Sequence, residues 1–228
     1  MDAVLVAGGT GGLGEAVLRT LLAAGRPVVA TYRREAERER IEQQLDAGPR
    51  LQLVHADLLQ ADAAERAVAT VDRLGAVVNL VGGYAGGRKV HEIDADEFDR
   101  MLALNLRPAF LLARATMPRL TGAGGGAFVA VSARAALQPF SGAAAYIAAK
   151  AAVLAFVRAL DAEYRDAGVR CNAVLPSVID TPANRRSQPD ADHRRWVAPE
   201  EIARVVEFLV SDASSATSGA AIPVYGRA

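Results

Sequence analysis

The sequence lacks the features that mark secreted, membrane-spanning and nucleic-acid-binding chains. It holds a single cysteine, Cys171, so no disulfide can close within the chain, and a reducing compartment suits it. No apolar run reaches the ~18 residues that span a membrane, and the N-terminus has no signal-peptide pattern. Basic and acidic residues balance at 26 each, which indicates no nucleic-acid partner. We therefore expect a cytoplasmic protein that binds neither membranes nor nucleic acid.

What the chain does have is a regular alternation of apolar runs and helical patterns. Hydrophobic residues make up 51% of the sequence, which is enough for a sizeable core. Because the short apolar runs suit buried parallel strands, we expect strands at residues 3–7, 27–32, 51–55, 76–81, 127–131, 169–174 and 221–225. The main helices between them are expected at 15–25, 34–45, 62–73, 94–120, 142–167 and 199–210.

The order of these segments predicts a single α/β domain over residues 1–228 with a Rossmann fold. Strand–helix alternation without repeats, linkers or composition breaks is typical of a doubly wound parallel sheet, here of about seven strands. Ligands of such sheets bind at the C-terminal ends of the strands. The 94–120 helix should be kinked at Pro108, with Asn105 in its middle, where the amide could pair with freed backbone groups or hold a water.

A glycine-rich turn, residues 8–14 (GGTGGLG), joins the first strand to a helix. Glycines let the backbone approach phosphates, and a helix N-terminus offers unpaired N–H groups and a partial positive charge. Its place between strand and helix therefore predicts a dinucleotide-phosphate cradle rather than a flexible loop. A second glycine-rich stretch, residues 82–87, follows the fourth strand and indicates either close contact with a ligand or mobility.

The end of the second strand bears on which coenzyme is preferred. An acidic residue about 20 positions past the glycines would bind a ribose 2′-hydroxyl, but the strand ends at Tyr32, followed by Arg33 and Arg34. Arginines suit a 2′-phosphate, so NADP(H) is favoured over NAD(H). The alternative is that both arginines simply begin a charged, solvent-exposed helix. Asp57, past the third strand, could reach the adenine or cap the next helix.

Tyr146 and Lys150 stand four residues apart in an alanine-rich, proline-free run, and so share one face of the expected helix. A free phenol has a pKa near 10, and a neighbouring cation lowers it, which would make Tyr146 a usable acid. Taken alone, the pair could also be ordinary helix surface. Residues 183–198 are polar and turn-rich, which fits a substrate lid or a mobile surface loop. The three histidines have no metal-ligand spacing, so no metal site is expected.

In combination, these motifs resemble those of the short-chain dehydrogenase/reductases along the whole chain. The residues that carry the resemblance are Ala7–Gly14, Asp57-Leu58, Asn79-Leu80-Val81-Gly82, Asn105, Tyr146-x-x-x-Lys150, Pro176–Thr181 and Ser218-Gly219.

The resemblance implies that Tyr146 protonates the substrate as NADPH delivers hydride to a carbonyl or a conjugated C=N or C=O group. It implies that Lys150 lowers the pKa of Tyr146 and binds the nicotinamide ribose, and that Asn105 positions a water. It also implies dimers or tetramers through the two long helices. The implied cofactor-binding residues are Gly8, Thr10, Gly12, Leu13, Gly14, Tyr32, Arg33, Arg34, Asp57, Leu58, Val81, Gly82, Gly83, Tyr146, Lys150, Pro176, Val178 and Thr181.

One departure from the family pattern affects the substrate. The family's catalytic serine, 13 residues before the tyrosine, is Ala133 here. Ser132 should point to the opposite face of the strand, so we expect it not to take over that role. Quinonoid dihydropteridine reductases are similar in this alanine and in residues 81–87 and 180–192. The substrate stays open between a ketone or 3-oxoacyl compound and a pterin-like ring, with a catalytically silent NADP(H)-binding protein as the alternative function.

Overall fold

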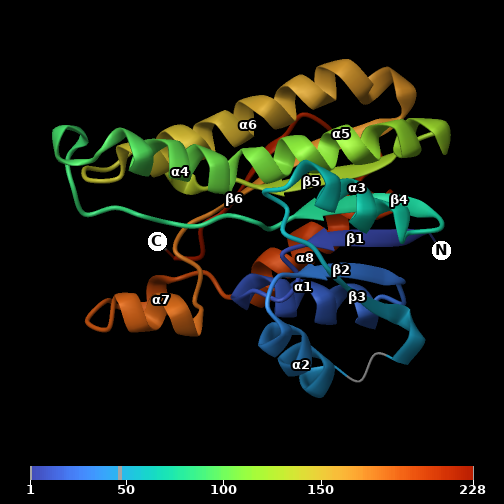
Figure 1. Cartoon of the computed structure of the whole chain (residues 1–228), viewed down its shortest axis with the longest axis horizontal. Coiled ribbons are helices and arrows are strands. Elements are labelled where there is room, and N and C mark those ends of the chain that lie inside the picture. Colours follow the sequence, from blue (N-terminus) through green and yellow to red (C-terminus); the bar gives the residue numbers. More distant parts are fainter. Residues whose placement is uncertain (1, 46–47, 228) are drawn as a thin grey trace.

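Seven parallel strands form one central sheet with the order β3-β2-β1-β4-β5-β6-β7 (Figure 1). A computed structural model describes residues 2–45 and 48–227 of the chain. The strands are β1 (Ala3–Ala7), β2 (Val28–Tyr32), β3 (Leu51–His55), β4 (Leu74–Asn79), β5 (Gly126–Val131), β6 (Val169–Pro176) and β7 (Ala221–Val224). This topology confirms the predicted single-domain, doubly wound Rossmann sheet. The strand order reverses between β1 and β4, which is where such folds bind their ligands.

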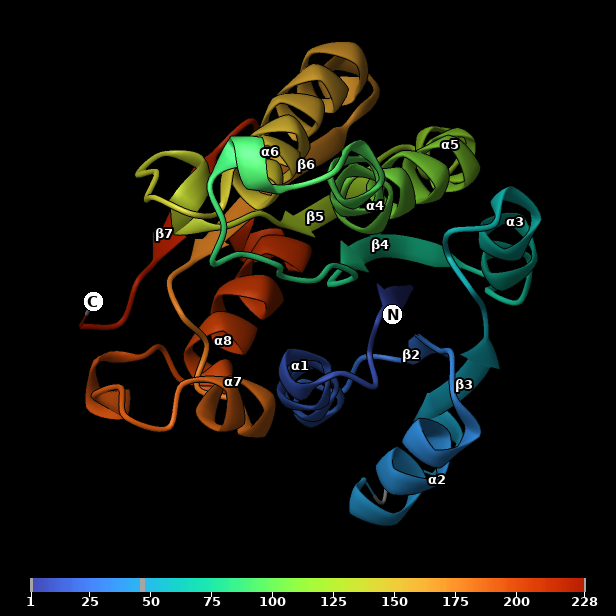
Figure 2. The same cartoon turned by 60° about the vertical axis from the view of Figure 1, so that its left-hand side comes forward.

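Helices cover both faces of the sheet, as Figure 2 shows. They are α1 (Gly12–Ala23), α2 (Glu35–Gln44), α3 (Ala61–Ala69), α4 (Ala95–Asn105), α5 (Arg107–Gly122), α6 (Ala144–Tyr164), α7 (Pro182–Ser187) and α8 (Pro199–Val210). Short 3₁₀ helices lie at Gly48–Arg50, Val90–Glu92, Arg134–Ala136, Arg165–Ala167, His193–Arg195 and Asp212–Ser214. Among the described residues, no helix is long and apolar enough to cross a membrane.

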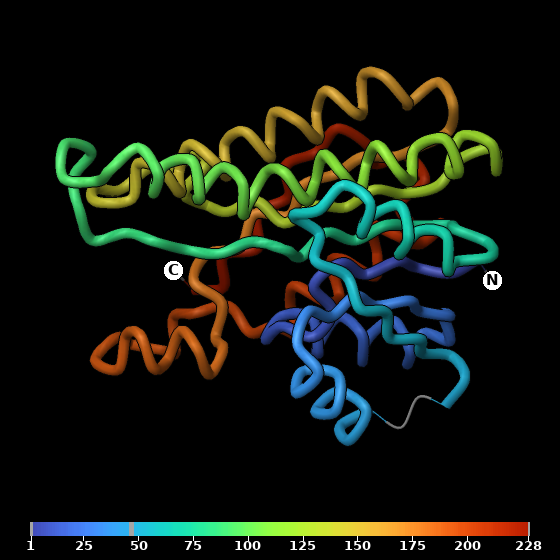
Figure 3. Tube along the Cα trace, viewed as in Figure 1, coloured from blue at the N-terminus to red at the C-terminus, as the bar shows by residue number. Residues whose placement is uncertain are grey.

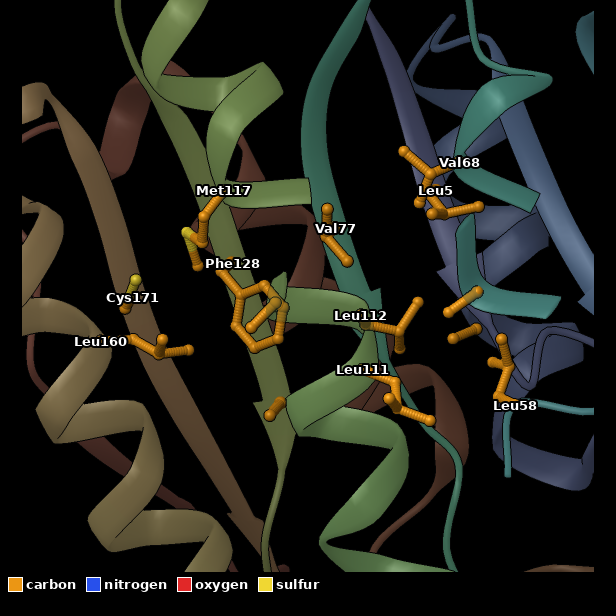
Figure 4. Packing of buried hydrophobic residues seen from close by; sticks show 14 of the residues in the cluster. Leu5, Leu58, Val68, Val77, Leu111, Leu112, Met117, Phe128, Leu160 and Cys171 are labelled. Atoms are coloured by element: carbon orange, nitrogen blue, oxygen red, sulfur yellow. The ribbon is translucent and has the colours of Figure 1, made fainter. Parts of the chain in front are cut away.

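Alternation along the strands divides the core into two layers. Leu5 of β1 packs with residues of α3, α5 and α6 on one face, whereas the adjacent Val4 packs with residues of α1, α2 and α8 on the other. Phe128 of β5 is fully buried in the first layer, beside Met117 of α5 (Figure 4). Cys171 lies in the same layer, where burial raises the pKa of its thiol to about 12, so it is an uncharged core residue.

The expected 94–120 helix is two helices, and this corrects the prediction of one kinked helix. The break falls at Leu106, whose N–H still bonds to the carbonyl of Leu102. Pro108 belongs to the first turn of α5, where its missing N–H costs nothing. Asn105 is therefore the last residue of α4 and does not lie in the middle of a helix.

The C-terminal strand ends face the side of the molecule on which residues 80–94 and 177–198 lie (Figure 3). Residues 80–94 run out along α4 before the chain turns back into that helix. The polar 183–198 segment is partly helical, because Thr181 caps α7 by accepting a hydrogen bond from the N–H of Asn184. The Asp180 carboxylate also binds Arg185 at 2.5 and 2.7 Å, which fixes the start of this segment.

Candidate active site

A cavity of about 220 Å³ opens at the C-terminal ends of β1–β4. Eight of the predicted cofactor residues line it: Gly8, Thr10, Tyr32, Arg33, Asp57, Leu58, Val81 and Gly82. The other lining residues were not among the predicted cofactor-binding residues: Gly11, Thr31, Glu37, Ala56, Leu59, Leu80 and Leu104. Most of them adjoin a predicted residue and follow from the strand-end rule, but Glu37 and Leu104 come from helices α2 and α4.

The glycine turn at this cavity has no room for a side chain at Gly14. A Cβ added to Gly14 would lie 2.4 Å from the carbonyl oxygen of Gly9, and Gly8 has a left-handed φ of 75°. The N–H of Gly8 donates to the Thr31 hydroxyl at 3.1 Å, which ties the turn to β2. Helix α1 begins at Gly12, and its N-cap residue Gly11 has no side chain to cap it, so the first N–H groups of the helix are available to a ligand. The turn therefore fits the phosphates of a dinucleotide.

The remaining predicted cofactor residues do not line this cavity. Gly12 contacts Thr181, because an added Cβ would lie 3.0 Å from the threonine methyl. Leu13 packs partly against the core layer of α1 and α8. Pro176 ends β6 beside Val224 of β7. Val178 is partly exposed, and its carbonyl accepts a hydrogen bond from Val197.

Asp57 lines the cavity, and its carboxylate accepts a hydrogen bond from the N–H of Leu59 at 3.2 Å. Helix α3 begins later, with Gln60 at its N-cap position. The alternative that Asp57 caps that helix is therefore wrong. The expectation that its carboxylate reaches the adenine stays a prediction.

Helix α6 brings Tyr146 and Lys150 next to the segment that follows β4. The Lys150 ammonium is buried and donates a hydrogen bond to the carbonyl of Val131 at 3.1 Å. A Cβ added to Gly82 would lie 2.9 Å from that ammonium, so only glycine permits this approach. The half-buried Tyr146 ring meets the Tyr84 ring edge-on, with centroids 5.0 Å apart and planes at 80°.

Burial dominates the charge state of both side chains. It raises the pKa of Tyr146 to about 12, and the neighbouring Tyr84 adds to this rise. Burial also lowers the pKa of Lys150 to about 8. The rise at Tyr146 is opposite to the fall that the Tyr–Lys spacing predicted, because burial and the neighbouring Tyr84 both raise this pKa. Tyr146 therefore keeps its proton at neutral pH, as a proton donor must.

The Asn105 side chain fixes the second glycine-rich stretch. Its amide nitrogen donates to the carbonyls of Gly83 at 3.1 Å and Met101 at 3.0 Å, and its oxygen accepts from the N–H of Gly83 at 3.1 Å. At the far end, the N–H of Gly87 bonds to the carbonyl of Gly142 at 2.8 Å. Of the two sequence alternatives for Asn105, the structure shows pairing with the backbone. Its water-positioning role stays a prediction.

Ser132 and Ala133 directly follow the end of β5, and Ser132 contacts α6. The buried Ser132 hydroxyl donates a hydrogen bond to the backbone carbonyl of Lys150 at 2.7 Å. This bond commits the hydroxyl to the helix backbone, in line with the expectation that Ser132 does not replace the missing serine. Ala133 is buried and has no polar side-chain atom.

A doubly wound sheet, a glycine cradle at the β1–α1 turn and a tyrosine–lysine pair beside it define a dinucleotide-dependent oxidoreductase. The comparisons agree. A family model described as short chain dehydrogenase matches residues 2–192, and the chain belongs to this family. The family uses nicotinamide cofactors, so the protein is an NAD(P)-dependent oxidoreductase.

Relatives cover nearly the whole chain. It is 29% identical over 243 residues to 2-(R)-hydroxypropyl-CoM dehydrogenase of Xanthobacter autotrophicus, covering 97% of this chain and 96% of the relative. It is 31% identical over 234 residues to cis-4-hydroxycyclohexanecarboxylate dehydrogenase of Sinomonas cyclohexanicum, covering 97% and 94%. A short-chain type dehydrogenase/reductase structure from Mycobacterium ulcerans has a TM-score of 0.94 at 28% identity, covering 99% and 89%.

Proposed function

We propose that the protein is an NADPH-preferring reductase in which Tyr146 gives a proton to a carbonyl or conjugated C=N/C=O substrate. The observation that carries this proposal is the Tyr146 phenol, protonated at neutral pH and one helical turn from the Lys150 ammonium. Gly82, which lines the predicted dinucleotide cavity, lies against the same ammonium. This arrangement supports a reaction in which a cofactor in the cavity and Tyr146 act on one substrate.

The residues divide the work of binding and proton transfer. The glycine turn and the start of α1 would hold the phosphates, and Asp57 would contact the adenine. An ammonium has three donors, and in the described structure Val131 takes one, which leaves two for ribose hydroxyls. The bound nicotinamide supplies the hydride. Tyr146 then donates its proton to the atom of the substrate that gains negative charge.

A ketone or 3-oxoacyl compound is the first substrate candidate. The two relatives compared above are named as dehydrogenases of hydroxyl compounds, whose oxidation produces carbonyl groups. A pterin-like conjugated ring is the second candidate, favoured by Ala133. A serine there would polarise a carbonyl oxygen, whereas an electron-poor ring can react with hydride and one proton alone. The loss of the serine therefore harms this chemistry less.

The proposal includes a cytoplasmic location and assembly into dimers or tetramers through the α4–α5 and α6 helices. Phe110 of α5 is 48% exposed, and its ring lies 6.3 Å from that of Phe156 on α6. An exposed aromatic ring that packs beside a partly buried one on the adjacent helix suits burial against a second copy.

A substrate screen with NADPH and NADH side by side tests this function. We expect oxidation of NADPH, followed by its absorbance, with members of a panel of ketones, 3-oxoacyl thioesters and quinonoid pterins. Turnover confined to the pterins would select the second candidate. Tight nucleotide binding without turnover on the whole panel would contradict the reductase and favour a silent binding protein.

The pH dependence of reduction provides a second test. Because burial lowers the pKa of Lys150 to about 8, its ammonium loses its charge above that pH. We expect kcat/KM for reduction to be level near neutrality and to fall as the pH rises through about 8. Lys150→Arg keeps its charge throughout and should lose this fall, although its overall rate is lower. A wild-type profile that is level up to pH 10 would contradict a role for the ammonium.

A further inference from the structure

An acidic side chain reaches the ribose end of the cavity from an unexpected element. Glu37, in the first turn of α2, lines the cavity together with Thr10, Tyr32 and Arg33. Its carboxylate accepts a hydrogen bond from the Thr10 hydroxyl at 3.2 Å. The strand-end rule finds no acid here because Glu37 lies five residues beyond Tyr32, on the next helix.

Two contacts tie helix α2 to the glycine turn and hold Glu37 in this place. One is the bond between Glu37 and the Thr10 side chain. The other comes from Arg40, whose guanidinium donates to the Thr10 carbonyl at 2.7 Å and to Glu15 at 2.6 Å. Contacts with several residues therefore fix the position of Glu37. An acidic residue that only stabilises a helix N-terminus needs no such contacts.

The same carboxylate engages one of the two arginines expected to bind a 2′-phosphate. Arg34 donates to Glu37 from its Nε atom at 2.7 Å and also from a terminal nitrogen. Burial tends to raise the pKa of Glu37, but Arg34 and Thr10 together hold it below the usual value, so the group is ionised at neutral pH. Arg33 lines the cavity, and within the described residues its guanidinium has no hydrogen-bond partner.

These charges act in opposite directions on the two coenzymes. A carboxylate is a good acceptor for the paired hydroxyls of an unmodified ribose. A 2′-phosphate carries a charge near −2, which the carboxylate repels and the arginines attract. Arg34 can direct its donors fully to that phosphate only after its hydrogen bonds to Glu37 break.

We propose that Glu37 sets the coenzyme selectivity of this enzyme, accepting hydrogen bonds from the ribose hydroxyls of NAD(H) and restraining Arg34 from the 2′-phosphate of NADP(H). This inference rests on the cofactor site of the proposed function. It deepens that proposal, because Arg33 and Arg34 favour NADP(H) while Glu37 opposes them and keeps NAD(H) in use. The relative affinity for the two coenzymes is then set by a residue outside the usual strand-end position.

Glu37→Gln tests the proposal, because glutamine keeps the shape and removes the charge. Dissociation constants are measured by calorimetry for NADPH and NADH, and for 2′,5′-ADP and 5′-AMP, which carry only the ribose end. Losing a charged hydrogen bond costs about tenfold to a hundredfold in affinity, so we expect the ratio of NADPH to NADH affinity to rise by at least about tenfold. The ratio of 2′,5′-ADP to 5′-AMP affinity should rise with it.

Glu42→Gln is the matched control, because Glu42 lies on the same helix, exposed and paired with Arg38 at 3.0 Å. It should leave both ratios unchanged. Arg34→Met should weaken NADPH binding and spare NADH, which tests the proposal through a second residue. Unchanged ratios in Glu37→Gln and in Arg34→Met would overturn the inference alone. A wild-type protein that binds neither NADPH nor NADH would instead contradict the proposed function.

Discussion

Tyr146→Phe is expected to abolish reduction while leaving the cofactor bound. The substitution removes only the hydroxyl, and Phe keeps the edge-on contact with the Tyr84 ring. A positioned proton donor contributes about 10²- to 10⁴-fold to a rate, so kcat should fall by at least about a hundredfold. The measurement is NADPH oxidation with the best substrate of the screen, alongside NADPH binding followed by fluorescence. NADPH affinity should fall far less than kcat, because the glycine cradle that would hold the phosphates is unchanged.

Tyr164→Phe is the matched control for this experiment. Tyr164 ends the same helix, α6, and packs partly against the core, away from the cavity. It should leave both turnover and NADPH binding unchanged. Full turnover in Tyr146→Phe would remove the mechanism, whereas equal loss in both variants would indicate a general effect on the helix.

Much of the fold could be predicted because its strands are local apolar runs and its turns use glycine. The strand at 3–7 was expected where β1 lies, and the glycines mark the turn into α1. The break between α4 and α5 was misplaced because it depends on a distant contact. Asn105 bonds to Gly83, 22 residues earlier in the chain, and this pairing is not visible in helical periodicity. The proline showed that a break was near and gave no exact position.

In the candidate site too, the sequence predicts a side-chain position only where that position does not depend on distant packing. Strand-end positions such as Gly8 and Asp57 follow from sheet topology, and the structure places both at the cavity. Glu37 does not follow from it, because its approach depends on how α2 packs over the glycine turn. The pKa of Tyr146 was also beyond the sequence, since spacing on a helix reveals the neighbouring lysine but not the burial that raises the pKa of the phenol.

The raised pKa of Tyr146 and the lowered pKa of Lys150 suit one direction of reaction. Near neutral pH, the phenol is protonated and the ammonium is mostly charged, which is the pair that reduction requires. Oxidation of an alcohol needs the phenolate instead, so it should become faster as the pH rises. The electrostatics of these two residues therefore favour reduction under neutral conditions.

Of the glycines in the turn, Gly14 has the least space for an added side chain. It lies in the first turn of α1, and its Cα faces the backbone of the preceding turn. An added Cβ would lie 2.4 Å from the Gly9 carbonyl oxygen and 2.6 Å from that of Gly8, well inside contact distance. Backbone atoms cannot rotate away as a side chain does. The turn that would bind the phosphates must therefore move.

Gly14→Ala is accordingly expected to weaken NADPH binding by at least about tenfold and to destabilise the fold by about 1–3 kcal/mol. For a chain of this length, that loss lowers the melting temperature by roughly 2–12 °C. Fluorescence titration and thermal unfolding measure the two effects. Gly122→Ala is the control, because Gly122 ends α5 and an added Cβ there meets no atom within 4 Å. If Gly14→Ala bound NADPH as tightly as Gly122→Ala does, the close packing of the cradle would not be what shapes the phosphate site.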